Sequence, residues 1–171
     1  MRERLNEPRL RDFMRALARE ARDYGRVYIA GGASAVLLGW RETTLDVDLK
    51  IIPEDDRLLR AIAALKESLN VNIEQATPED FIPALPGWQD RSPFIAMEGK
   101  LSFHHYDFYA QALAKIERDH MIDREDVQNM IDAGLVNRTR LLELFEAIEP
   151  QLHRFLAINP RQFAERVRKL Q

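Results

Sequence analysis

Residues 27–52 read VYIAGGASAVLLGWRETTLDVDLKII, and this stretch decides the fold class. It begins with a short apolar β run over residues 27–30, which two glycines interrupt. Residues 33–39 are apolar and compatible with a helix. Residues 45–51 then alternate between apolar and charged side chains, which is the period-two pattern of a strand with one buried face. The stretch therefore predicts a strand, a glycine turn, a short helix and a second strand.

The flanking sequence extends this pattern in both directions. The expected elements are a helix over residues 9–23, a helix over 54–69, a strand over 71–75, a hairpin of 94–97 and 100–103, and about four helical segments from Asp107 onward. Helices and strands alternate first, and helices alone follow. This order predicts an α/β (α+β) fold with a helical C-terminal half.

Length and composition limit the possibilities further. With 171 residues, of which 46% are hydrophobic, the chain can bury one sizeable core. We expect a single domain over residues 1–171, with an N-terminal helix over 9–23, a sheet-bearing core over 26–106 and a helical part over 107–171. A net charge of −3 gives no general basic field for nonspecific nucleic-acid binding.

Several classes of protein are not expected. The chain has no cysteine, which excludes disulfides and thiolate zinc sites, and we expect neither haem nor zinc. The N-terminal segment is charged throughout, and no run approaches the ~18 apolar residues of a membrane span. We therefore expect a cytoplasmic protein that does not associate with membranes.

Two aspartates in the second predicted strand are the first candidate site residues. Asp46 and Asp48 point to the same side of a strand, where like charges repel unless solvent or a cation compensates them. Two carboxylates on rigid β structure are well placed to hold a divalent metal, and hard oxygen ligands suit Mg²⁺ or Mn²⁺. The alternative is a strand whose second face is simply solvated.

The glycine pair is the second candidate. Gly31 and Gly32 lie at a predicted strand-to-helix turn, where missing side chains let backbone N–H groups approach a phosphate. A polyphosphate held there would have oxygens free to reach a metal on the neighbouring strand. The alternative is an ordinary tight turn.

Together these residues form a pattern: Gly31-Gly32, then Gly39-x-Arg41-x-Thr43-Thr44-x-Asp46-x-Asp48. The pattern resembles the signature of the polymerase-β-like nucleotidyltransferase superfamily in its minimal form, specifically the branch of AbiEii-type toxins. The resemblance implies the minimal nucleotidyltransferase fold with a mixed sheet. It also implies a glycine turn that cradles the triphosphate and two acidic residues that bind Mg²⁺.

The resemblance assigns further residues to the nucleotide site. Many members carry serine directly after the first glycine, whereas here Gly32 holds that place and Ser34 is the nearest hydroxyl. The nucleotide-binding residues expected from the resemblance are Gly31, Gly32, Ser34, Arg41, Thr44 and Lys115. A third carboxylate usually comes from a nearby strand. Glu74 is the candidate, either as a metal ligand or as a proton acceptor, and the alternative is a solvent-facing glutamate.

A second motif lies in the helical half. Residues 112–118, followed by Asp123 and Asp126, resemble the second motif of the AbiEii-type branch. Lys115 lies beside the apolar stripe of its helix, so it could reach a nucleotide phosphate or extend to solvent. We expect Asp123 and Asp126 to cap the next helix. His104 and His105 lack spaced partners, and they are expected to be core or surface residues.

The resemblance implies transfer of a nucleoside monophosphate from an NTP to a hydroxyl of RNA (such as tRNA), a protein or a small molecule. Such a protein could be a component of a toxin-antitoxin pair. The alternative is a noncatalytic protein of the same fold that acts as an antitoxin-like or regulatory binding partner.

Overall fold

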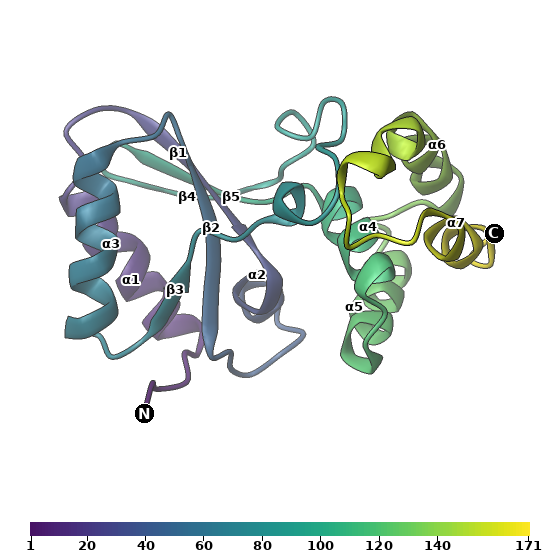
Figure 1. The fold of residues 1–171 in the computed structure, drawn as a ribbon. Coiled ribbons are helices and arrows are strands. Elements are labelled where there is room, and N and C mark those ends of the chain that lie inside the picture. Colours follow the sequence, from purple (N-terminus) through teal and green to yellow (C-terminus); the bar gives the residue numbers. More distant parts are fainter. The chain divides into compact units, whose positions relative to one another are not determined.

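The computed structural model describes all residues from 1 to 171 (Figure 1). The chain divides into two compact units. The sheet unit comprises Met1–Thr77 and Pro93–Tyr106, and the helical unit comprises Pro78–Ser92 and Asp107–Gln171. Whether the two units fold as a single domain, as the chain length predicts, stays a prediction.

The sheet unit contains one mixed five-stranded sheet. Its elements are α1 (Glu7–Arg19), β1 (Gly25–Ala30), α2 (Gly31–Leu37), β2 (Asp46–Ile52), α3 (Asp56–Ser68), β3 (Asn72–Glu74), β4 (Phe94–Glu98) and β5 (Leu101–His105). The strand order is β3-β2-β1-β5-β4. The β1–β2 and β4–β5 pairs are antiparallel, and the β1–β5 and β2–β3 pairs are parallel. The predicted fold class is confirmed, including the mixed sheet.

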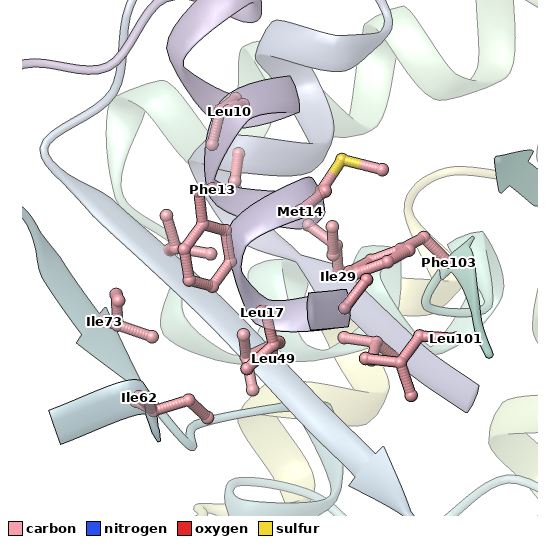
Figure 2. Packing of buried hydrophobic residues seen from close by; sticks show 14 of the residues in the cluster. Leu10, Phe13, Met14, Leu17, Ile29, Leu49, Ile62, Ile73, Leu101 and Phe103 are labelled. Atoms are coloured by element: carbon pink, nitrogen blue, oxygen red, sulfur yellow. The ribbon is translucent and has the colours of Figure 1, made fainter. Parts of the chain in front are cut away.

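One face of this sheet carries the apolar core. The alternation predicted for β2 places Val47, Leu49 and Ile51 in the core, whereas the charged residues between them point to the opposite face. Figure 1 shows α1 and α3 side by side over the core face, and Figure 2 shows Phe13 and Leu17 of α1 pointing toward the strands. Because β2 contributes only one of its faces to the apolar core, its other face is left for polar side chains.

The N-terminal helix differs from its predicted bounds at both ends. The apolar repeat starts at Leu10, but the helix begins three residues earlier because Asn6 caps it, its side chain accepting a hydrogen bond from the backbone of Arg9 at 3.1 Å. Pro8 also fits the first turn of a helix, where no backbone donor is needed. The helix ends at Arg19 rather than at residue 23, ahead of the strand that begins at Gly25.

The helical unit contains the four α-helices that the sequence predicts. They are α4 (Phe108–Arg118), α5 (Met121–Asp132), α6 (Arg138–Ile148) and α7 (Pro160–Arg168), accompanied by short 3₁₀ segments at Pro78–Asp80 and Glu149–Arg154. Phe145 and Phe163 meet edge to face with ring centroids 4.9 Å apart, joining α6 to α7. No helix in the chain is both long enough and apolar enough to cross a membrane.

Candidate functional site

Gly31 stands directly against the carboxylate of Asp48. Ala30 of β1 pairs in register with Asp48 of β2, so the residue after Ala30 meets that side chain. A Cβ at Gly31 would lie 2.6 Å from Asp48 Oδ2, and Gly31 has a φ of +63°. Both the backbone angle and the contact disfavour a larger residue. The positive φ and the neighbouring carboxylate together therefore favour glycine at this position.

Gly32 makes the corresponding contact with the loop before β2. A Cβ at this position would overlap Thr44 Oγ1 and lie 3.3 Å from Arg41 Nη1. The hydroxyl of Thr44 donates to the carbonyl of Asp46 at 3.1 Å, and the Thr44 main chain forms an antiparallel bridge with Leu5. The loop is thus fixed to both the N-terminal segment and β2. Arg41 and Thr44, two of the predicted nucleotide-binding residues, lie at the glycine turn.

The three predicted carboxylates lie on the neighbouring strands β2 and β3. Asp46 pairs in register with Asn72, and Asp48 with Glu74. The side-chain amide of Asn72 donates to Asp46 Oδ1 at 2.6 Å and to Glu74 Oε1 at 2.9 Å. Its partial positive charge offsets repulsion between the two carboxylates. The alternation of side chains along β3 predicts that Asn72 and Glu74 share a face. The hydrogen bond from Asn72 to Asp46 can be seen only from the register between β2 and β3.

The carboxylates fit a hard divalent cation by their chemistry. Their donors are carboxylate oxygens on adjacent strands, which suit Mg²⁺ or Mn²⁺. The bare Cα of Gly31 leaves room for Asp48 at the same edge. No group of three or more histidine or acidic side chains is already gathered as a metal site. Metal binding by Asp46, Asp48 and Glu74 therefore stays a prediction that their donor atoms permit.

The side chain of Ser34 is buried and is not exposed at the glycine turn. Ser34 is only 1% exposed, and its Oγ lies 2.7 Å from Nδ1 of His105. Burial, with smaller effects from the charges of Arg11 and His104, lowers the pKa of His105 to about 4. The ring is therefore neutral at pH 7. His105 is buried, which is one of the two positions expected for it, but nothing in its sequence spacing shows that its partner is Ser34.

Lys115 belongs to the helical unit and is also buried. It is 9% exposed, its Nζ donates to Asp126 Oδ2 at 2.7 Å, and Asp123 Oδ1 lies 3.8 Å away. Nothing in the structure tests its predicted contact with nucleotide. Asp126 was expected to cap α5, and this prediction is wrong: it is the sixth residue of α5, beyond the capping positions, and it pairs with Lys115.

The prediction that Asp123 caps α5 is confirmed. It is the third residue of that helix and accepts a hydrogen bond from the backbone N–H of His120 at 3.1 Å. Arg118 also donates to it, at 2.8 Å from Nε. Burial alone would raise the pKa of Asp123, but the hydrogen bonds and charges of these neighbours outweigh burial and lower the pKa. Asp123 therefore stays ionised inside the helical unit.

A protein-family model matches this chain. The family model described as "Nucleotidyltransferase of unknown function (DUF6036)" matches residues 8–168, which is nearly the whole chain. Searches of curated proteins and of solved structures returned no significant match.

Proposed function

The chain belongs to the family of nucleotidyltransferases of unknown function (DUF6036), and we propose that it transfers a nucleoside monophosphate from an NTP to a hydroxyl acceptor. One observation carries this proposal: two bare glycines bring a main-chain turn directly against Asp48 and Thr44. A turn without side chains can approach a polyphosphate closely. Here that turn and the carboxylates of β2 lie at one edge of the sheet.

Each residue of the candidate site has a proposed role in nucleotide binding or metal binding. Gly31 and Gly32 let the polyphosphate approach the main chain, and the guanidinium of Arg41 offsets its negative charge. Asp46 and Asp48 would hold Mg²⁺ or Mn²⁺, and Glu74 would either complete that metal site or accept the hydroxyl proton. Such an ion, when bound, neutralises charge on the transferring and leaving phosphates.

The proposed reaction is an in-line displacement at the α-phosphorus. The acceptor oxygen forms a new bond to that phosphorus, the bond to the bridging oxygen of the β-phosphate breaks, and pyrophosphate leaves with the bond's electron pair. The hydroxyl proton passes to a carboxylate of the site. Glu74 is suited to that step because it is exposed at the end of β3.

The finer assignment follows from the motifs. We place the chain in the AbiEii-type branch, on the support of the pattern from Gly31 to Asp48 and the second motif around Lys115. We therefore propose that the protein is cytoplasmic and forms one component of a toxin-antitoxin pair. The proposed acceptor classes are RNA, including tRNA, a partner protein or a small molecule.

Labelled nucleotides test the reaction class. Lysate is incubated with the protein, Mg²⁺ and each NTP in turn, labelled at either the α- or the γ-phosphate. Nucleotidyl transfer predicts that α-label enters an acceptor and that γ-label does not. Asp46→Asn combined with Asp48→Asn should abolish labelling, and Asp132→Asn, at an exposed position of the helical unit, should retain it. Absence of α-label with all four NTPs would contradict the proposal and favour a noncatalytic binding role.

A further inference from the structure

A buried side-chain pair joins α2 to the end of β5. Ser34 is the fourth residue of α2, and His105 is the last residue of β5. Their side-chain atoms, Oγ and Nδ1, lie 2.7 Å apart, and the two residues are 1% and 7% exposed. Separating such a pair inside the protein would cost each polar group a buried partner. The pair therefore favours one position of α2 relative to β5.

The main chain fixes the strand side of this pair. Ile29 of β1 pairs in register with His105, and its carbonyl accepts a hydrogen bond from the backbone of Tyr106 at 2.8 Å. The backbone N–H of His105 donates to the carbonyl of Pro93, also at 2.8 Å. His105 is thus held by hydrogen bonds at its own backbone and at that of the next residue. Its ring is a fixed point to which α2 can be anchored.

The helix that receives this anchor is short. α2 has seven residues, and its N-cap residue, Ala30, makes no side-chain capping hydrogen bond. A helix of this length has too few internal hydrogen bonds to be stable without tertiary contacts. On the β2 side, contact comes from Gly31 against Asp48 and Gly32 against Thr44. On the β5 side, the pair of Ser34 and His105 provides a polar anchor.

We infer that His105 is a positioning residue, which acts through Ser34 to hold the turn of Gly31 and Gly32 in place beside Asp48. This inference rests on the proposed function, because the turn is the proposed phosphate-binding element. It gives Ser34 a role from beneath the turn instead of a direct contact with phosphate. Loss of the anchor should let the turn shift, and a shift of about 1 Å in a positioned site is enough to reduce activity strongly.

β5 offers a matched control. His104 Nε2 lies 3.1 Å from Ser102 Oγ, so the neighbouring histidine also pairs with a serine. Both of those residues belong to β5, so their hydrogen bond does not reach α2. Ser34→Ala and Ser102→Ala therefore remove the same hydroxyl from the same kind of pair. His105→Leu removes the anchor from the other side, and His105→Asn retains a polar atom near the position of Nδ1.

Two measurements on the full chain test the inference. The first is amide hydrogen exchange at residues 31–33, and the second is the Kd for ATP in the presence of Mg²⁺. For Ser34→Ala and His105→Leu we expect exchange at these amides to become about tenfold faster and the Kd to rise about tenfold. His105→Asn should restore much of both, and Ser102→Ala should behave as the wild type. Melting curves report which variants are folded, and Ser34→Ala is the smaller change if His105→Leu does not fold.

The outcomes separate this inference from the proposed function. It is overturned if Ser34→Ala matches Ser102→Ala in both measurements, or if exchange accelerates while the Kd stays unchanged. If the wild type binds neither ATP nor any of the other three NTPs with Mg²⁺, the proposed function fails. The exchange rates then decide alone whether the pair anchors the turn: faster exchange in Ser34→Ala supports the anchor, and unchanged exchange refutes it.

Discussion

Replacing Gly31 by alanine should damage the site more than it damages the fold. Alanine at a φ of +63° costs about 1–2 kcal/mol of stability. The new Cβ would lie 2.6 Å from Asp48 Oδ2, so that carboxylate must turn away. An off-rotamer side chain adds roughly 0.5–1.5 kcal/mol. The expected loss of unfolding free energy is therefore about 1.5–3.5 kcal/mol, together with loss of Mg²⁺-dependent nucleotide binding.

Gly134→Ala is the control for this substitution. Gly134 follows α5 at a φ of +74°, and a Cβ there would meet nothing within 4 Å. This variant should therefore lose only the backbone contribution, about 1–2 kcal/mol, and keep full affinity for Mg²⁺-ATP. Urea unfolding and calorimetric titration measure the two quantities. If Gly31→Ala binds Mg²⁺-ATP as tightly as Gly134→Ala does, the contact between the turn and Asp48 has no functional role.

Three further substitutions test separate contacts. Gly32→Ala should lower the unfolding free energy by about 1–2 kcal/mol, because the new Cβ displaces the Thr44 hydroxyl from its hydrogen bonds. The loss should be smaller when Thr44 is already alanine, and equal losses with and without Thr44→Ala would contradict the contact. The pKa of His105 is lowered to about 4, so between that pH and ~6.5 the unfolded chain binds a proton that the folded chain does not. This contribution to the unfolding free energy should be complete above pH ~6.5 and should be lost, by about 3 kcal/mol, as the pH drops to ~4. In urea unfolding, His105→Asn should weaken this dependence of stability on pH, and an unchanged dependence would exclude His105 as its source. Lys115→Met should lower the unfolding free energy by about 3 kcal/mol because it leaves the buried carboxylate of Asp126 without its cation; wild-type stability in this variant would refute a structural role for the pair.

Local periodicity was sufficient to predict most elements of the fold. The alternation in residues 45–51 identifies β2 and its buried face, and glycines mark the start of α2 and the turn after it. The same period places Asn72 and Glu74 on one face of β3. Each of these signals depends on neighbours within a few residues, which one chain segment contains by itself. The resemblance to a nucleotidyltransferase pattern then supplied the mixed sheet.

Contacts between distant segments could not be predicted in this way. Ser34 and His105 are 71 positions apart, and neither belongs to a repeating pattern that would indicate a pair. Lys115 was placed correctly at the margin of the apolar stripe of α4, but its burial depends on how α5 packs beside it. The resemblance suggested a role at the nucleotide for both Ser34 and Lys115, and that role stays a prediction. The buried partner of each depends on tertiary packing, which the sequence did not indicate.

The affinity of Asp48→Asn for ATP, with and without Mg²⁺, tests the central claim most directly. If Asp48 holds a metal beside the glycine turn, the wild type gains affinity on addition of Mg²⁺, and the variant does not, because an amide is a poor ligand for a hard dication. Melting curves of both proteins report whether the variant is folded, so that a lost response to Mg²⁺ can be assigned to the site. A folded Asp48→Asn protein that still gains the wild-type increment in affinity from Mg²⁺ would contradict the account.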